Sequence, residues 1–227
     1  MRSLQGFTLL ETVFALFIGL LLLGAIYTSM VSGQKSSLAL EGKVMAHQDT
    51  RAALEVMALE IGMASYNRHF VPGIWRNPGN CGQPSAYPAY KGIPMATSNS
   101  ITMEMDIGES GFVGDNPNEI ISYVYDVANE RITRETNCQG ALPFLGDVPG
   151  SSRSVRVINH TLNMPVFRYF DGLGNEIAAA NLPADIPKIK KIEIILATET
   201  EEVAPDTLQR RRMIYSTSVI SRNHATN

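Results

Sequence analysis

The N-terminal part of the chain contains one long apolar run. Of the 25 positions in residues 7–31, 18 are hydrophobic, and Glu11 is the single charged residue. Within this run, the 18 residues at positions 9–26 have about the length at which a helix crosses the hydrocarbon core of a bilayer. The pattern therefore predicts a transmembrane helix over residues 7–31.

The free energy of insertion favours this prediction. Residues 9–26 include twelve Leu, Ile, Val or Phe residues, which together contribute on the order of −5 kcal/mol on the insertion scale. Glu11 would cost about 3 kcal/mol at the bilayer centre, but it lies near one end of the run, where the cost is smaller. Arg2 precedes the run and Lys35 is the first base after it, so the positive charges favour an N-terminus in the cytoplasm.

A conventional cleaved secretory signal is the alternative interpretation of this run. Such a signal has a basic start, an apolar stretch of about 7–15 residues and a cleavage site of the small-x-small type. Here the apolar run is longer, the bases before it are sparse, and the carboxylate of Glu11 lies close to its start. These features favour a membrane helix over a conventional signal.

The hydrophobic pattern predicts that the helix continues well beyond the membrane. No proline occurs in residues 34–66. Apolar residues recur there at helical spacing, at Leu54, Met57, Ala58 and Ile61. Polar residues fall between them and form the predicted polar face, at Arg51, Glu55 and Glu60. An amphipathic helix of this kind needs a partner to cover its apolar stripe, and the rest of the chain must supply it.

The remaining sequence alternates in the manner of short strands separated by turns. Six Pro and seven Gly in residues 70–118 interrupt any long element there. Residues 101–107 alternate cleanly and are predicted as a half-buried strand. The other predicted strands, the first two of which form a hairpin, are residues 120–127, 130–136, 154–158, 166–170, 188–197 and 211–221. A long N-terminal helix followed by about seven strands predicts an α+β fold with an antiparallel sheet packed on the helix.

Composition and charge narrow the class of protein. The chain has 227 residues, of which 44% are hydrophobic and 18% charged, and its formal net charge is −3. These values suit one modest globular domain joined to the apolar run, and they exclude a disordered chain or a polytopic membrane protein. With 22 acidic against 19 basic residues and no long basic run, nucleic acid is not expected as a main partner.

The N-terminal motif resembles that of a known group of proteins. The chain opens with MRSLQGFTLLETVFALFIGLLLLGA. This is similar to the class III signal of type IV pilins and type II secretion pseudopilins, in which a hydrophilic leader ends in Gly and is followed by Phe, by Glu as the fifth mature residue, and by an apolar helix. Gly6, Phe7 and Glu11 fall on these positions. The resemblance implies cleavage between Gly6 and Phe7 by a prepilin peptidase and N-methylation of the new amino terminus on Phe7.

The resemblance also implies a division of the chain. It gives a prepilin leader peptide at residues 1–6, a transmembrane and polymerisation helix at residues 7–31, and a periplasmic or extracellular α+β head at residues 32–227. The charge of Glu11 is costly beside lipid. In a filament, this carboxylate would neutralise the terminal amine of Phe7 in a neighbouring subunit. The alternative interpretation is a carboxylate that lies at the level of the lipid headgroups without a partner.

The second half of the chain resembles PilW-type minor pilins and the related J-type minor pseudopilins. The resemblance rests on the strings ISYVYDVANERITRET, VFRYFDGLGNEI, IKKIEIILATET and SVISRN. It implies a minor pilin of the inner membrane, with its head in the periplasm, that primes assembly and enters the pilus or its tip at the cell surface. The implied partners are prepilin peptidase, other minor and major pilins, and the inner-membrane assembly platform.

Two alternatives to this function stay open. A J-type pseudopilin of a type II secretion system would have the same N-terminal signal and similar strands. An adhesin-like binding module at the tip of a filament is compatible with the same architecture.

The two cysteines, Cys81 and Cys138, lie in the part of the chain predicted to be outside the cytoplasm. An even number of cysteines in an oxidising compartment favours a disulfide. Closing a loop of about 57 residues would stabilise the fold by roughly 4 kcal/mol in the chain-entropy model. The alternative is a pair of free or metal-binding thiols, but the sequence offers no CxxC and no nearby pair of histidines.

The sequence contains no catalytic motif, so we expect no enzymatic activity, no cofactor and no metal site. Its four histidines lack the HxxxH and HExxH spacings, no GxSxG elbow occurs, and no Gly-rich phosphate loop follows a strand. Residues 171–176 place oxygen ligands in a tight turn. This turn is too short for an EF-hand loop, so a plain hairpin turn is favoured over a calcium site.

Two further features leave a functional and a structural interpretation open. The arginines at residues 210–212 form either an anionic docking patch or, beside Glu199, a solvated hairpin between the last two strands. The aromatic residues Trp75, Tyr87 and Tyr90 form either an adhesive surface or a cover for the sheet.

Overall fold

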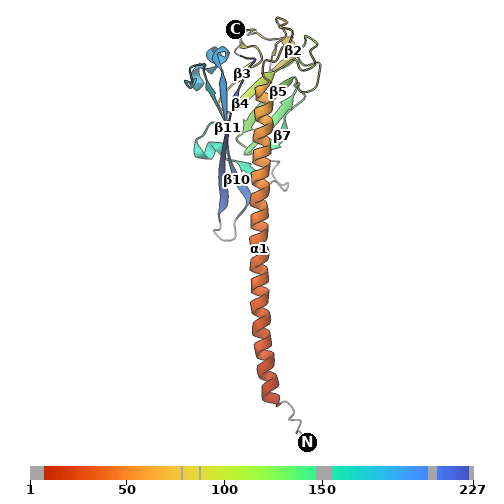
Figure 1. Ribbon diagram of the computed structural model, residues 1–227, viewed down its shortest axis with the longest axis vertical. Helices are drawn as coiled ribbons and strands as arrows, with labels where there is room; N and C mark the ends of the chain where they lie inside the picture. Colours follow the sequence, from red (N-terminus) through yellow and green to blue (C-terminus); the bar gives the residue numbers. More distant parts are fainter. Residues whose placement is uncertain (1–7, 78, 87, 147–154, 204–208, 225–227) are drawn as a thin grey trace.

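The long helix predicted at the N-terminus dominates the computed structural model, which describes residues 8–77, 79–86, 88–146, 155–203 and 209–224. Helix α1 (Leu9–Gly62) is continuous over 54 residues, and the head packs against one face of its C-terminal part, where the buried residues run from Ala46 to Ile61 (Figure 1). Among the described residues, α1 is the one helix long and apolar enough to cross a membrane.

The head contains two antiparallel sheets that flank the second half of α1, and a small separate hairpin (Figure 1). One sheet has the order β3-β4-β5-β6-β7, and in the other β10 pairs with β11, β8 and β9, while β1 pairs with β2. The strands are β1 (Arg76–Asn77), β2 (Asn80–Pro84), β3 (Met95–Ala96), β4 (Ser100–Glu104), β5 (Ile120–Asp126), β6 (Arg131–Thr136), β7 (Leu142–Leu145), β8 (Val155–Val157), β9 (Phe167–Phe170), β10 (Lys191–Val203) and β11 (Arg210–Ile220). The short helices are α2 (Leu182–Asp185) and the 3-10 turns η1 (Pro88–Tyr90), η2 (Asn159–Leu162), η3 (Ala179–Asn181) and η4 (Ile186–Lys188).

The head packs against a single stripe of residues on α1. The buried positions of the helix recur every three or four residues, as expected for one helical face, and they are Ala46, Thr50, Ala53, Leu54, Met57 and Ile61. They join one hydrophobic cluster with inward-facing residues of both sheets, among them Tyr123, Phe167 and Ile194. The sheets therefore supply the cover that the amphipathic half of the helix requires.

The predicted fold class is confirmed, because a long N-terminal helix packs against antiparallel sheets in an α+β arrangement. Each of the seven predicted strand regions contains a strand, and the hairpin at β5 and β6 is in register from Ile121 opposite Thr136 to Asp126 opposite Arg131. The structure adds β1, β2, β3 and β7, which the sequence did not predict. These strands are two to five residues long, too short to show an alternating pattern.

The prediction of a half-buried strand at residues 101–107 is wrong in two respects. The strand β4 ends at Glu104, and every residue from 101 to 106 is buried. The reason is a second layer on the far face of this sheet, where Ile74, Trp75, Val113 and Ile120 form their own apolar cluster. The Pro/Gly-rich segments before and after β4 fold over the polar positions of the strand.

Candidate functional site

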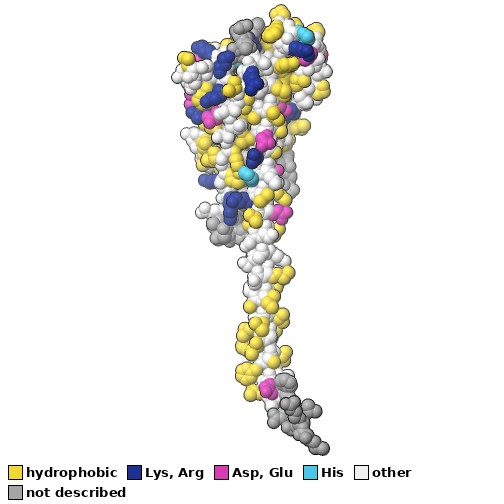
Figure 2. Space-filling model, viewed as in Figure 1, with side chains coloured by type: hydrophobic (Ala, Val, Ile, Leu, Met, Phe, Trp, Pro, Cys, Tyr) yellow, Lys and Arg dark blue, Asp and Glu magenta, His cyan; other side chains and the backbone are white. Residues whose placement is uncertain are grey.

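The first 37 residues of α1, from residue 9 to residue 45, include no buried residue. Large apolar side chains cover this part of the helix, with exposed fractions of 83% at Leu9, 66% at Leu20 and 62% at Ile26. Figure 2 shows hydrophobic side chains along the part of the rod outside the head. In water such a surface is unfavourable at about 25 cal/mol per Å² of apolar area, so it requires lipid or other helices around it.

The start of α1 is set by Thr8 and Glu11. The hydroxyl of Thr8 accepts a hydrogen bond from the backbone N–H of Glu11 at 3.3 Å, and Oε2 of Glu11 accepts one from the backbone N–H of Thr8 at 2.9 Å. This reciprocal capping box satisfies two backbone donors that the first turn of a helix leaves without partners. The same carboxylate oxygen also accepts from the Thr8 hydroxyl at 3.0 Å.

The capping box gives Glu11 a role within its own chain that the sequence analysis did not assign. The sequence signal was available, because Thr8 and Glu11 have the T-x-x-E spacing of a capping box directly before an apolar run. Only Oε2 is engaged by described residues, so Oε1 stays available to a cation. Gly6 and Phe7, the predicted cleavage and methylation positions, lie outside the described residues, and the ion pair between subunits stays a prediction.

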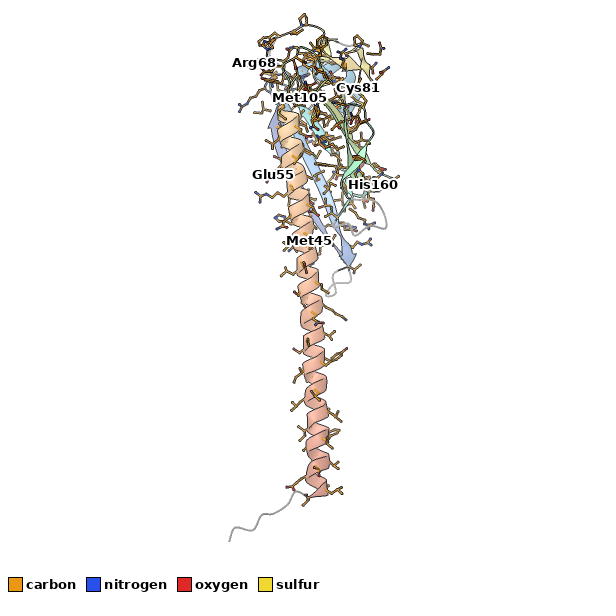
Figure 3. All side chains as sticks on the ribbon, turned by 90° about the vertical axis from the view of Figure 1, so that its right-hand side faces the viewer. Met45, Glu55, Arg68, Cys81, Met105 and His160 are labelled. Atoms are coloured by element: carbon orange, nitrogen blue, oxygen red, sulfur yellow. A yellow bond between two sulfur atoms is a disulfide. The ribbon has the colours of Figure 1, made fainter. Side chains whose placement is uncertain are left out.

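A segment of α1 that we call the neck, residues 32–45, separates the predicted membrane span from the head. Its 14 residues rise by about 21 Å at 1.5 Å per residue. Four of its apolar side chains are exposed by 45% to 63%, namely Leu38, Leu40, Val44 and Met45. Figure 3 shows Met45 close to the base of the head. Exposed apolar side chains therefore recur beyond the predicted span, after residues 32–37, which contain no hydrophobic residue.

Glu60, which the sequence analysis placed on the polar face, is held inside the head instead. Its carboxylate accepts hydrogen bonds from Nη2 of Arg134 at 2.7 Å and from Nε at 3.1 Å, and the hydroxyl of Tyr123 donates to it as well. Burial of the phenol and its hydrogen bond to Glu60 raise the pKa of Tyr123. The polar face is interrupted here because the side chains of Tyr123 in β5 and Arg134 in β6 reach the last turn of the helix.

Cys81 and Cys138 form a disulfide with a Cα–Cα distance of 6.1 Å. Cys81 lies in β2 and also packs against the apolar cluster that contains Trp75. Cys138 follows β6 in a turn where it adopts a φ of 55°. The bond thus joins the Pro/Gly-rich cover to the sheet beneath it.

The remaining candidate residues make structural contacts. The carboxylate of Asp171 accepts hydrogen bonds from the backbone N–H groups of Leu173 and Asn175, at 2.8 and 2.9 Å, as in a hairpin turn. Nε of Arg212 lies 2.9 Å from Oε2 of Glu199 across the last two strands, the hairpin that the sequence predicted. The described part of the chain contains no group of three or more His, Cys, Asp or Glu residues placed to hold a metal ion.

Three of the histidines form hydrogen bonds between segments. His47 Nδ1 lies 2.6 Å from the hydroxyl of Tyr215, and His160 Nδ1 lies 2.8 Å from that of Tyr125. His224 Nδ1 lies 2.9 Å from the hydroxyl of Ser65, and its other ring nitrogen lies 2.8 Å from the carbonyl of Ile186. These bonds attach helix α1, β5 and the C-terminal segment to their neighbours.

The aromatic residues proposed for an adhesive surface are divided between the core and the surface cover. Trp75 is 8% exposed and belongs to the second apolar cluster, and Tyr90 packs against the main core. Tyr87 lies outside the described residues. Covering the sheet is therefore the role of the two described aromatic residues.

Comparison with known proteins finds a family match at the N-terminus. Residues 1–27 match the family described as the prokaryotic N-terminal methylation motif, which is typical of type IV pilin-like proteins. No curated protein and no solved structure matches the chain significantly. The family is structural and not enzymatic. The motif, the exposed apolar helix and the α+β head together support a type IV pilin-like or pseudopilin-like protein.

Proposed function

We propose that the protein is a minor pilin of a type IV pilus, which is inserted in the inner membrane through α1 and then enters the filament or its tip complex. Prepilin peptidase removes residues 1–6, and Phe7 becomes the methylated amino terminus. The head lies in the periplasm before assembly and at the cell surface afterwards. Apolar contacts between helices drive incorporation, and the charge of Glu11 sets the register.

The observation that carries this proposal is the length of the exposed apolar surface on α1. A membrane-spanning helix needs about 20 apolar residues, and beyond residues 32–37, which contain no hydrophobic residue, exposed apolar side chains recur at Leu38, Leu40, Val44 and Met45. A membrane anchor alone does not account for these four side chains, because in water such positions would be expected to be polar. Neighbouring helices of a filament would cover both parts.

The N-terminal processing is tested by mass spectrometry of the protein extracted from membranes. We expect a mature chain that begins at N-methyl-Phe7. An intact Met1, or cleavage near Val31, would contradict the proposal.

The role of Glu11 is tested by two substitutions that separate capping from charge. Glu11→Gln keeps an oxygen that accepts the hydrogen bond from the Thr8 backbone, since both Glu and Gln serve in a capping box, but it removes the charge. Glu11→Ala removes both. If the charge pairs with a neighbouring amine, both variants are inserted in the membrane but fail to enter filaments. Normal incorporation of Glu11→Gln would show that only the cap matters.

Deletion of the gene distinguishes the pilus from a secretion machine. Loss of surface pili with protein secretion intact supports the minor pilin. Loss of secretion with pili intact identifies a pseudopilin of a type II secretion system.

A further inference from the structure

The end of the head remote from the membrane helix contains a hollow of about 740 Å³ that no part of the proposed assembly uses. Its walls come from the turn that follows α1, from the segment that leads to β1, and from the residues after β11. Figure 3 shows one of its residues, Arg68, at the end of the head opposite to the N-terminus of α1. Its volume lies within the range of small-molecule sites, about 300–1,000 Å³. We call it the tip hollow.

The tip hollow is cationic. Its described lining includes Arg68, Lys91 and Arg222 and contains no Asp or Glu. Arg222 is exposed and forms no ion pair with any described residue. Arg68 pairs with Glu109 just outside the lining, at 2.6 Å, but described residues engage only its Nη1. Two guanidinium groups therefore present N–H donors to the hollow.

Burial and the positive charge of Lys91 in the lining lower the pKa of the neighbouring His224. This pKa falls to about 4, and the positive charge of Lys190 lowers it as well. The imidazole is thus neutral at physiological pH. The positive charges beside the hollow are therefore those of Arg68, Lys91 and Arg222, and that of Arg68 is paired with Glu109.

The rim also holds an aromatic side chain in a strained position. Phe70 is 85% exposed and has a φ of 51°, in the left-handed region that is a genuine outlier for a bulky side chain. Asn67 fixes the turn, because its side chain accepts a hydrogen bond from the N–H of Val71 at 3.1 Å and donates one to the carbonyl of Val71 at 2.9 Å. An exposed ring does not repay this strain by packing, and such strain is concentrated at ligand-binding sites.

The base of the hollow is preformed. The N–H of Gly92 donates to the hydroxyl of Ser65 at 3.1 Å, and that hydroxyl donates in turn to His224. Ser65 is only 5% exposed, so these bonds lie inside the fold and fix the wall. A ligand would not have to order this surface, which reduces the entropic cost of binding.

We propose that the tip hollow binds a carboxylate-bearing sugar of an acidic polysaccharide. The planar guanidinium groups of Arg68 and Arg222 match the geometry of carboxylates. The ring of Phe70 offers a flat apolar face to the C–H face of a sugar. Nucleic acid is less suitable, because affinity for a duplex comes mainly from the number of phosphates that are neutralised, and the hollow has three cations, one of which is paired with Glu109.

The test uses the full chain in detergent micelles and isothermal titration calorimetry with tri-galacturonate as the probe. We expect saturable binding, and we expect the fully methyl-esterified trimer to bind at least tenfold more weakly. Arg222→Gln removes one charge-assisted contact and is expected to weaken binding by at least fivefold. Phe70→Asn keeps a residue that tolerates the left-handed conformation and removes the ring, with a similar loss. Arg51→Gln, an exposed arginine on α1, is the matched control and leaves binding unchanged.

Several outcomes would overturn the proposal. Equal binding of the methyl ester would exclude a role for the carboxylates. Equal or tighter binding of penta-glutamate would identify a docking surface for an acidic polypeptide instead of a sugar site, and competition by millimolar inorganic phosphate would identify a general anion site. An equal loss in Arg51→Gln would assign binding to overall charge. The proposal goes beyond filament assembly, and its failure would leave the N-terminal processing experiment unaffected.

Discussion

Oε1 of Glu60, in the last turn of α1, lies 2.7 Å from Nη2 of Arg134 in the middle of β6. The two side chains are only 15% and 22% exposed, so water screens the pair less than it would a surface pair. Tyr123 donates to the same carboxylate, and Asn118 accepts a hydrogen bond from Nη2 of Arg134 at 2.9 Å. The membrane helix is thus attached to the sheet by a polar contact as well as by its apolar stripe.

We predict that Arg134→Gln destabilises the protein by about 2 kcal/mol, because it leaves the charge of Glu60 half-buried without its cation. Equilibrium unfolding of the full chain by urea, in a constant concentration of detergent, gives the free energy. Arg51→Gln is the control, since its partner Glu55 and Arg51 are 65% and 69% exposed and such pairs contribute less than about 1 kcal/mol. Equal effects of the two substitutions would contradict the assignment. A double-mutant cycle with Glu60→Gln isolates the coupling between the two side chains.

Sequence periodicity predicted α1 because the pattern is local. Apolar spacing at Leu54, Met57 and Ile61 identifies the buried face regardless of what covers it. It could not predict that Glu60 is half-buried, because the cation that compensates its charge is 74 residues further along the chain. In the same way, nothing local to Thr102 or Glu104 indicates the second layer of the head. That layer is made of irregular segments held by a disulfide, and such segments have no period.

The disulfide gives the second prediction. The double substitution Cys81→Ser and Cys138→Ser is expected to destabilise the head by roughly 4 kcal/mol, because the open chain gains the conformational entropy of a loop of 57 residues. Urea unfolding measures the loss, and reduced wild-type protein is the matched control. A denaturing gel tests first whether the disulfide exists. The bond is refuted if reduced and unreduced protein have identical mobility and two thiols react with a label.

Glu104 gives a prediction about pH. Its side chain is fully buried; Oε2 accepts a hydrogen bond from the N–H of Arg76 at 2.8 Å, and Oε1 has no hydrogen-bond partner among the described residues. Burial raises the pKa of this carboxyl to about 8. The folded state therefore holds a proton that the unfolded state releases near pH 4.5. The stability that this proton provides is complete below about pH 4.5 and is lost as the pH rises to about 8.

The range above pH 6.5 is dominated by this effect, because His224, whose folded pKa is about 4 against 6.5 unfolded, is neutral in the folded state and loses only its remaining half charge in the unfolded state, which raises the free energy of unfolding by about 0.4 kcal/mol. Between pH 6.5 and 8, Glu104 is expected to lower the free energy of unfolding by about 2 kcal/mol. Glu104→Gln cannot titrate, and we expect it to flatten the profile in this range. Urea unfolding at several pH values measures both proteins, and parallel profiles would contradict the raised pKa.

The sequence predicted the N-terminal part of α1 better than it predicted the tip hollow. The long apolar helix was predicted correctly, because its pattern is local to the sequence, while the role of Glu11 between subunits stays a prediction. The capping box between Thr8 and Glu11 was not predicted, although the T-x-x-E spacing is present directly before the apolar run. The tip hollow combines Arg68 with Arg222, which meet only through the fold of the whole head.

The last prediction concerns the neck. Leu38 is 61% exposed in the isolated chain, so Leu38→Asp disturbs no contact of the folded head, and the residue lies outside the predicted span at residues 7–31. We therefore expect membrane insertion and the stability of the head to be unchanged. In a filament, the same side chain would be enclosed by neighbouring helices, where an unpaired carboxylate costs several kcal/mol. Incorporation into filaments, measured by quantitative immunoblotting of sheared pili, is expected to fall by at least tenfold.

The control for this variant is Ser37→Asp, which adds the same charge one residue earlier, about 100° around the helix from Leu38, in place of a side chain that is already polar. Equal incorporation of Leu38→Asp and wild type would show that the apolar neck has no helix against it. If both variants lose incorporation to the same extent, a negative charge anywhere on this part of the neck prevents assembly. The apolar side chain of Leu38 would then have no specific role. A loss confined to Leu38→Asp would place the face of the neck that carries Leu38 against another subunit.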